Sequence, residues 1–385
     1  MARLAPMSER TRTAAGSSVP FLDLRPMHDG LGPAVLSELA SVIEEGAFIN
    51  GPQVASFERA FAAYCTTAHC VGMSSGLDAL RLGLLAAEIE LGAEVIVPAN
   101  TFVATFEAVT QAGLVPVPVD VGQSDYGLDP RAVESAVGSR TQAVLAVHLY
   151  GQLSNMRELD AIARRSRVAL VEDAAQAHGA TRDGFRAGAA GHFAAFSFYP
   201  GKNLGAMGDA GALATDDETL AEHARALREH GQRSKYVHER EGYTARLDTF
   251  QAVALLHKLP HLDGWNAQRA KVASSYREGL TGVGDLRLPE TPDGSTPVWH
   301  LYVVRTAEPE RLAEFLRERG IGTGRHYPIP PHLSAAYASL GYREGAFPVS
   351  ESLARECLSL PMFPGLSVAQ ADAVIEAVRE YFANG

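Results

Sequence analysis

Strand-length apolar runs alternate with helix-length segments from Val54 to about residue 230, and this alternation limits the possible folds more than any other feature. The expected strands are Cys70–Met73, Glu94–Pro98, Val115–Val119, Ala143–Val147, Val168–Val171 and Ala194–Phe198. The expected helices are Ser56–Tyr64, Leu77–Ala87, Val103–Gln111, Pro130–Val137, Met156–Arg165 and Glu218–His230. The pattern predicts an α/β fold with a mostly parallel sheet and helices on both faces. In such a sheet, ligands bind at the carboxyl ends of the strands.

The pattern changes after Arg246, which predicts a second, smaller unit. The elements expected there are the helices Thr249–Lys258 and Asn266–Leu280, the strand Val298–Arg305, and the helices Glu308–Arg319 and Val368–Phe382. We therefore expect a flexible tail over residues 1–19, a large domain over residues 20–270 and a small C-terminal α/β domain over residues 271–385.

The composition of the chain argues against binding to nucleic acid, association with membranes and a metal site. The chain has 34 basic and 45 acidic side chains and a formal net charge of -11, so it lacks the basic field that binds nucleic acid or an anionic membrane. No apolar run approaches the roughly twenty residues of a membrane span. The cysteines, Cys65, Cys70 and Cys357, form neither a disulfide framework nor, with His69, a complete metal site. These features indicate a cytoplasmic protein without a metal.

Only four of the basic side chains are lysines: Lys202, Lys235, Lys258 and Lys271. In a chain that otherwise uses arginine, a retained lysine is a candidate for a position that needs a titratable amine. Lys202 lies where the expected strand Ala194–Phe198 gives way to a glycine-rich loop. Burial at such a bend lowers the pKa of an amine and favours the neutral nucleophile that forms a Schiff base. A surface lysine beside a tight turn is the alternative.

Two carboxylates, Glu172 and Asp173, follow the apolar strand Val168–Val171. Successive strand residues point to opposite faces, so one of the two must face inward. An aspartate there could hold the protonated ring nitrogen of a pyridine cofactor. It could equally cap a helix or belong to a hydrolytic acid–base pair.

Two further strand ends carry groups that suit a ligand. Ser74, Ser75 and Gly76 stand between a strand and a helix, where free N–H groups and the helix dipole make a seat for phosphate. Serines at such a turn also serve as ordinary helix caps. Phe102 follows the strand Glu94–Pro98, where its ring could stack on a flat ligand or fill the core.

Together these strand-end groups meet the needs of one ligand. They offer a seat for phosphate, a partner for a ring nitrogen, a surface for a ring face and an amine for an aldehyde. The sequence therefore predicts that the chain binds pyridoxal 5′-phosphate.

A series of motifs spans nearly the whole chain: Pro20–Leu24, Gly51–Pro52, Phe57–Glu58, Ser75–Leu80, Val97–Phe102, Val147–Gln152, Glu172–Gln176, Ser197–Asn203, Arg246–Asp248, His300 and His326–Tyr327. In this order they resemble the DegT/DnrJ/StrS family of nucleotide-sugar aminotransferases. The resemblance implies fold type I of the enzymes that depend on pyridoxal phosphate.

The resemblance also implies roles for the matched residues. Lys202 forms the Schiff base and shuttles protons between the amino-acid and sugar carbons, and Asp173 pairs with the pyridinium nitrogen. The other implied cofactor contacts are Gln176 at the ring hydroxyl, Phe102 on the ring face, and Ser75, Gly76, Leu77 and Ser197 at the phosphate. In this family an asparagine from a second subunit typically completes the phosphate site. Thr244 stands at that place here and offers a hydroxyl instead.

The implied reaction moves the amino group of L-glutamate (or glutamine) onto a keto-deoxysugar linked to a nucleoside diphosphate such as dTDP. The product would serve amino-sugar and antibiotic biosynthesis, and the protein would be a homodimer with shared active sites. The run Phe198–Asn203 resembles family members that aminate C3 rather than C4. The implied substrate-binding residues are Arg325, His326, Tyr327 and His332, with Arg246 as a further candidate for the substrate's phosphates.

Two other functions stay open at this point. Gly72–Gly76 matches G-x-S-x-G, the turn that exposes the nucleophile of α/β hydrolases, with Ser74 as nucleophile, Asp173 as acid and His300 or His326 as base. No segment resembling HGGG supplies an oxyanion donor for that reading. The second is a non-catalytic regulator that binds pyridoxal phosphate on the same fold, although nothing resembles an appended helix-turn-helix.

Overall fold

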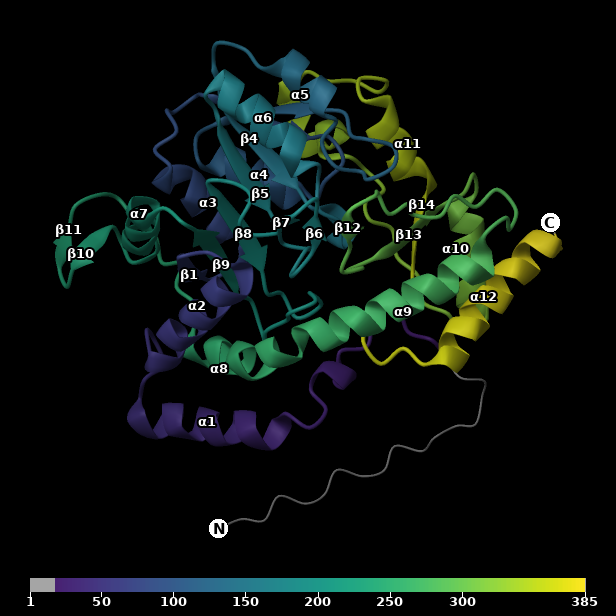
Figure 1. Ribbon diagram of the computed structural model, residues 1–385, viewed down its shortest axis with the longest axis horizontal. Coiled ribbons are helices and arrows are strands. Elements are labelled where there is room, and N and C mark those ends of the chain that lie inside the picture. The colour runs from purple at the N-terminus through teal and green to yellow at the C-terminus, as the bar shows by residue number, and fades with distance from the viewer. Residues whose placement is uncertain (1–17, 385) are drawn as a thin grey trace.

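A seven-stranded sheet lies at the centre of the protein, which a computed structural model describes over residues 18–384 (Figure 1). The strand order is β1-β9-β8-β5-β4-β2-β3. The strands are β1 (His69–Met73), β2 (Glu94–Pro98), β3 (Val115–Val119), β4 (Thr141–Val147), β5 (Ala169–Asp173), β8 (Phe193–Ser197) and β9 (Gly211–Thr215). Every neighbouring pair from β8 to β3 is parallel, and β9 is antiparallel to both of its neighbours. The predicted α/β fold with a mostly parallel sheet is therefore confirmed.

Helices cover both faces of this sheet. One face carries α3 (Gly76–Ala86), α4 (Val103–Gln111) and α7 (Glu218–Arg228), and the other carries α2 (Pro52–Cys65), α5 (Pro130–Ala136), α6 (Met156–Ser166) and α8 (Thr249–Lys258). Residues of β4 alternate between the two cores, with Leu145 on the α3–α4 side and Val144 on the α2–α6 side. This double burial explains the continuous apolar runs of the parallel strands. The same alternation in β5 turns Asp173 and Glu172 to opposite faces.

The small C-terminal unit has a core of its own. Its main elements are β13 (Tyr302–Arg305) antiparallel to β14 (Cys357–Leu360), α10 (Pro309–Glu318), α11 (Pro348–Glu356) and α12 (Val368–Ala383), with the 3-10 turns η4 (Pro331–Leu333) and η5 (Ala335–Leu340). Tyr337 of η5 and Leu353 of α11 pack instead in the core on the α3–α4 side of the large sheet. Helix α9 (Leu262–Leu280) runs unbroken through residue 270, and its second half packs in the small core. We keep 20–270 and 271–385 as the proposed domains.

The N-terminal segment connects the two units. Residues 1–17 of the expected tail lie outside the described residues, but Val19 is buried in the small core, where its N–H donates to the carbonyl of Gly320 over 2.9 Å. The chain then passes through the 3-10 turn η1 (Arg25–Met27) to α1 (Gly32–Glu45). Helix α1 packs on α8, below the sheet in Figure 1.

Smaller elements complete the fold. A three-stranded sheet joins β12 (Ser295–Thr296), β6 (Thr181–Arg182) and β7 (Phe185–Arg186), and β10 (Gln232–Ser234) with β11 (Val237–His238) forms a hairpin that projects at the left of Figure 1. The remaining 3-10 turns are η2 (Leu149–Gly151) and η3 (Leu259–His261).

Several elements differ from the sequence prediction or were absent from it. Strand β13 begins at Tyr302 rather than at Val298, because the N–H groups of Val298 and Leu301 donate to the carbonyls of Gly151 and Tyr150 in the large unit. Strand β9 and helix α1 were not predicted. Over residues 18–384, no helix is long and apolar enough to cross a bilayer, no three metal-ligating side chains converge, and the cysteines are buried free thiols.

Candidate active site

A cavity of about 510 Å³ opens at the carboxyl edge of the central sheet. Its lining includes most of the residues with expected roles: Ser75, Gly76, Leu77, Phe102, Asp173, Gln176, Ser197, Lys202, His326 and Tyr327. Strand ends of the large unit provide the first eight, and the small unit provides the last two. The cavity therefore lies where the two units meet.

Lys202 enters this cavity from a tight bend after β8. Its backbone N–H donates to the carbonyl of Tyr199 over 2.8 Å, and the N–H of Ala206 donates to Phe198 over 2.7 Å. Burial lowers the pKa of the Lys202 amine to about 8, although the nearby carboxylate of Asp173 opposes this shift. Roughly a tenth to a fifth of the amine is therefore neutral near physiological pH and able to act as a nucleophile, far more than for an ordinary lysine.

Asp173 ends β5 and points to the same cavity. Thr105 Oγ1 donates to its Oδ2 over 2.9 Å, and the N–H of Ala175 donates to its Oδ1 over 3.2 Å. Burial nevertheless raises the pKa of this carboxyl group, because these donors and Lys202 compensate only part of the lost hydration. A further cationic donor would therefore stabilise the charged form of the Asp173 carboxyl group. Thr105, which lies on α4, was not among the predicted site residues.

The first turn of α3 forms an anion seat beside Ser197. Ser75 caps the helix by accepting a hydrogen bond from the N–H of Asp78 over 3.0 Å, and the helix then begins at Gly76. A Cβ atom at Gly76 would lie 2.7 Å from the Cβ of Ser197, so only glycine allows this approach. The N–H groups of Gly76 and Leu77 at the start of this turn have no partner within the helix and can bind an anion.

Phe102, Tyr327 and Gln176 form another part of the cavity wall. The Phe102 side chain is 49% exposed, and its ring centroid lies 5.2 Å from that of Tyr327. Gln176 is fixed at both ends, because its Nε2 donates to the Tyr327 hydroxyl over 3.2 Å and its Oε1 accepts from the N–H of Tyr150 over 2.7 Å. A flat ring would find one apolar face and one amide edge here.

Two histidines near Lys202 are held neutral by burial. The pKa of His326 falls to about 4 and that of His300 falls well below its usual value, with the positive charge of Lys202 adding to the effect. His300 Nδ1 lies 3.1 Å from Asn203 Oδ1, and His326 Nδ1 lies 2.8 Å from Ser359 Oγ. His300 was named from the sequence among the family motifs and as a possible hydrolase base but was given no cofactor or substrate role, although it lies on the cavity wall.

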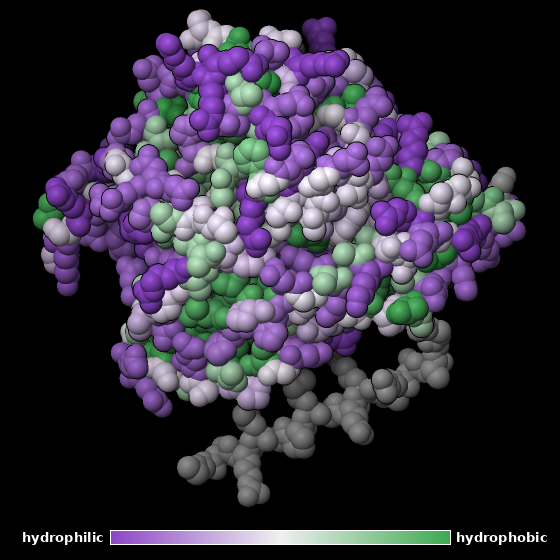
Figure 2. Space-filling view, in the orientation of Figure 1, coloured by the Kyte–Doolittle hydropathy of each residue, from purple (hydrophilic) through white to green (hydrophobic). Residues whose placement is uncertain are grey.

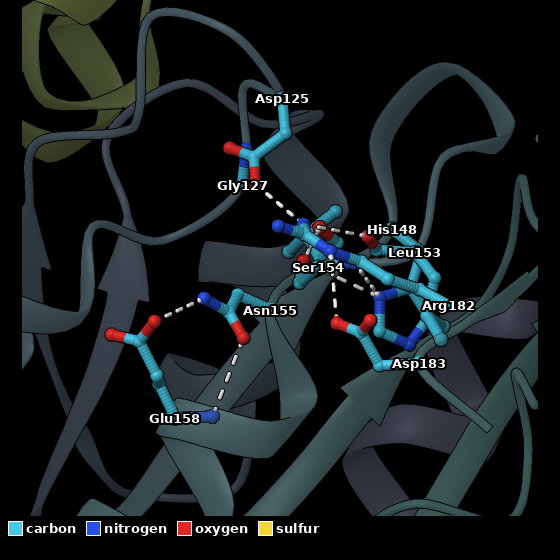
Figure 3. Close-up of polar contacts among 10 residues, drawn as sticks. Asp125, Gly127, His148, Leu153, Ser154, Asn155, Glu158, Arg182 and Asp183 are labelled. Atoms are coloured by element: carbon cyan, nitrogen blue, oxygen red, sulfur yellow. Dashed lines mark hydrogen bonds and ion pairs between the residues drawn. The ribbon is translucent and has the colours of Figure 1, made fainter. Parts of the chain in front are cut away.

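A polar network holds the loop that follows β4, behind the cavity. Figure 3 shows His148 beside Ser154, whose backbone N–H donates to His148 Nδ1 over 3.3 Å. It also shows Arg182 beside Asp125, where Arg182 Nη1 donates to Asp125 Oδ2 over 2.6 Å. The Nε2 of His148 bonds to the buried carboxylate of Glu172 over 2.9 Å. Glu172 also accepts backbone N–H groups of residues 188, 190 and 191. This second carboxylate of β5 therefore serves the structure on the far face of the sheet.

Several residues with expected roles lie outside the cavity. Arg325 forms an ion pair with Glu310 and donates to the carbonyls of α11, so its guanidinium is taken up within the small unit. His332 is buried, with its Nε2 3.3 Å from Glu351 Oε1. Neither residue lines this cavity, so their expected contact with substrate stays a prediction.

The phosphate contacts expected from Thr244 and Arg246 are also absent within the single chain. Thr244 Oγ1 lies 3.2 Å from His230 Nε2 at an exposed position, and Arg246 pairs with Glu229 over 2.8 Å. Ser74, the nucleophile of the hydrolase reading, is outside the cavity lining and bonds to the carboxylate of Asp78. Within residues 18–384 no histidine forms a hydrogen bond with Ser74, so the triad geometry is missing.

Comparison with known proteins agrees with this geometry. A sequence profile described as the DegT/DnrJ/EryC1/StrS aminotransferase family matches residues 31–379. The chain is 48% identical over 375 residues to the dTDP-3-amino-3,4,6-trideoxy-alpha-D-glucose transaminase of Streptomyces venezuelae, covering 97% of this chain and 98% of the relative. It is 50% identical over 361 residues to the erythromycin biosynthesis sensory transduction protein EryC1 of Saccharopolyspora erythraea, covering 94% and 99% of the two chains.

A solved structure shows the same fold. The crystal structure of S. venezuelae DesV in complex with a ketimine intermediate superposes with a TM-score of 0.92 at 48% identity, over 94% of this chain and 98% of that chain. The profile and the relatives thus cover this chain almost from end to end, and the chain belongs to the DegT/DnrJ/EryC1/StrS aminotransferase family.

Proposed function

We propose that this protein is a pyridoxal phosphate-dependent aminotransferase that moves the amino group of L-glutamate onto C3 of a dTDP-linked keto-deoxysugar. The observation that carries the proposal is that the Lys202 amine, whose pKa is about 8, and the carboxylate of Asp173 line one cavity and act on each other's charge. An amine that titrates near neutral pH beside a carboxylate that needs a cation is what this chemistry requires.

The residues of the cavity fit the cofactor. The space that a Cβ at Gly76 would fill is kept open between α3 and Ser197, which suits a phosphate held by the first turn of α3. Asp173, with one donor on each oxygen, can accept one more hydrogen bond, from a protonated ring nitrogen. Phe102 and Gln176 would hold the ring face and the ring hydroxyl.

The chain's own groups supply the proton movements. When bound, the cofactor supplies an aldehyde for amines and a ring that takes up the electron pair of a breaking C–H bond. The Lys202 Nζ takes the proton from the α-carbon of glutamate and, in the second half of the exchange, delivers a proton to the sugar carbon. Its pKa of about 8 makes both directions accessible near neutral pH. Phe21, Leu22 and Tyr327 line the cavity and exclude water from the reacting atoms.

The choice of substrate rests on the relatives. The name of the S. venezuelae relative specifies a dTDP-linked sugar with its amino group at C3, and its 48% identity extends over 97% of this chain. Within the cavity, His326 and His300 are neutral, so they can donate or accept hydrogen bonds at sugar hydroxyls without adding charge. These two histidines and Tyr327 are the proposed sugar contacts, in place of Arg325 and His332.

A homodimer is part of the proposal. Exposed apolar side chains gather around α1 and the start of α8: Leu36, Ile43, Phe48, Ile49 and Phe250. Figure 2 shows an apolar, hollowed area on this side of the molecule, in the lower half of the view. Patches of this kind on a folded protein mark sites of association. In the dimer, the exposed Thr244 would be free to reach the phosphate of the partner's site.

The experiment that tests the function follows both halves of the exchange. The purified enzyme with pyridoxal phosphate should convert L-glutamate to 2-oxoglutarate, and it should then place an amine on a 3-keto dTDP-deoxysugar, as located by NMR. The Lys202→Ala variant is the control and should do neither. Amination of only the 4-keto isomer would contradict the C3 assignment, and failure of the first half with glutamate, glutamine and other amino acids would favour the regulator reading.

A further inference from the structure

A second lysine is buried beneath the active site, and the reaction described above does not use it. Lys258, the last residue of α8, is 1% exposed, and its Nζ donates to the carbonyl of Gly205 over 2.7 Å. Its other polar neighbour is His28, whose Nε2 lies 3.3 Å away. Among the ion pairs of residues 18–384, none includes Lys258. A buried cation without a carboxylate costs stability that an apolar side chain would not.

The contact with Gly205 reaches the loop that carries Lys202. That loop folds back on itself, since a Cβ atom at Gly205 would lie only 2.2 Å from the carbonyl oxygen of Pro200. The bonds from Lys202 to Tyr199 and from Ala206 to Phe198 close the same bend. The Gly205 carbonyl thus belongs to the same closed bend as the backbone on both sides of Lys202.

His28 lies on the other side of the Lys258 amine and is its second hydrogen-bond partner. It follows η1 in the N-terminal segment, where burial and the charge of Lys258 lower its pKa. The neutral imidazole can accept a hydrogen bond from the Lys258 ammonium at Nε2. Asp29 is the one other charged group that acts on His28, and its effect opposes the lowering. Burial alone lowers the pKa of Lys258, to about 8.

We propose that Lys258, seated by His28, is a positioning residue that fixes the Gly205 carbonyl and thereby holds the Lys202 amine at its place in the cavity. The amine is suited to this because a single short donor group reaches both acceptors in a space closed to water, whereas the planar guanidinium of arginine is larger. The proposal rests on the proposed function only in giving Lys202 its chemical role.

The test compares Lys258→Met with Lys271→Met, a change at an exposed lysine of α9. In the enzyme loaded with pyridoxal phosphate, hydrogen exchange measured by mass spectrometry should become at least about tenfold faster over residues 199–208 in Lys258→Met and stay unchanged in Lys271→Met. The kcat should fall about 10- to 100-fold with KM within about twofold, because Lys202 is displaced while the substrate contacts remain.

A second pair of variants keeps the test decisive if Lys258→Met does not fold. His28→Leu removes the acceptor and should speed exchange of the same residues by a few fold, whereas His28→Gln retains an acceptor and should restore most of the protection. Unchanged exchange and kcat in Lys258→Met overturn the proposal. So does an unfolded Lys258→Met combined with an unchanged His28→Leu.

The exchange result also separates this proposal from the proposed function. If Lys202→Ala retained turnover, the function would fail while the exchange data would still report whether Lys258 holds the loop. If residues 199–208 lost protection in Lys258→Met while kcat stayed unchanged, Lys258 would hold the loop without affecting Lys202. That result would overturn the positioning role.

Discussion

The pKa of two buried lysines falls to about 8 for the same physical reason, yet their surroundings give them different capacities. Lys202 lies on a cavity wall opposite a carboxylate, whereas Lys258 is enclosed by a backbone carbonyl and an imidazole. Only the first can reach an aldehyde. At the scale of single residues, access to the cavity decides which amine does chemistry.

The lowered pKa of Lys202 predicts how cofactor uptake depends on pH. Only the neutral amine attacks an aldehyde, and below its pKa the neutral fraction rises about tenfold per pH unit. Uptake of pyridoxal phosphate by the cofactor-free protein, followed by its yellow absorbance, should therefore speed up with pH and level off near pH 8. A rate that still climbs at pH 10 is the behaviour of an unperturbed lysine and would contradict the assignment.

Replacing Asp173 with asparagine separates binding from catalysis. The amide keeps the size of the side chain and the phosphate seat is untouched, so the variant should still bind the cofactor. Its kcat with glutamate should fall about a hundred- to a thousandfold, because a neutral group cannot stabilise the protonated ring nitrogen. Turnover within tenfold of the parent enzyme, at saturating cofactor, would exclude the proposed role.

The types of residue in the sequence predicted Lys202 and Asp173 as site residues, but they did not predict the side chains that contact the residues of the site. Lys202 and Asp173 stood out because lysine is rare in this chain and because a carboxylate ends an apolar strand. Thr105 and His300 carry no such local signal, since their roles arise from contacts with residues 68 and 97 positions away. Arg325 and His332 were expected at the substrate, but Glu310 and Glu351 bind them within the small unit.

At the scale of elements, the approach of α3 to β8 makes the phosphate seat. Gly76→Ala would put a methyl group 2.7 Å from the Cβ of Ser197 and push the first turn of α3 away. Overpacking of this kind costs about 1–3 kcal/mol, so the dissociation constant for pyridoxal phosphate should rise about tenfold or more. Gly264→Ala, at an open position of α9, is the matched control and should leave affinity unchanged. Equal affinity of the two variants, measured by fluorescence titration, would count against the seat.

The sequence predicted elements best where packing and local pattern agree. Bounds for β2, β3, α4 and α8 match the prediction, since each is an apolar or amphipathic run between clear turn residues. Strand β9 escaped notice because its Gly-Ala-Leu-Ala-Thr residues have little intrinsic strand preference and pair only through β1 and β8. Helix α1 buries just Val35 and Val42, too few to mark it as part of the core.

At the scale of the whole molecule, the exposed apolar patch on α1 predicts a dimer. The parent chain of 41.0 kDa should sediment at about twice that mass. Ile43 is 59% exposed, and Ile43→Glu should shift the protein toward the monomer and lower activity with it if the sites are shared. Leu91→Glu, at an equally apolar exposed position before β2, should not. A fully active monomeric parent enzyme would refute the shared site.

The arrangement of the two units could be predicted only in outline. The change of pattern after Arg246 indicated a small C-terminal unit, but not that Val19 would pack in its core or that Phe21 and Leu22 would line the cavity. Such contacts join segments about 300 residues apart, as Val19 and Ile321 do, and no local periodicity encodes them.

The central claim is that one particular amine bonds to the cofactor, and chemical trapping tests it most directly. The holoenzyme is reduced with borohydride, digested, and mapped by mass spectrometry for the peptide that carries the reduced pyridoxyl phosphate group. We predict a single modified residue, Lys202, with Lys235, Lys258 and Lys271 unmodified. Label on Lys258 or another lysine in place of Lys202, or no label in an enzyme that turns over, would contradict the account.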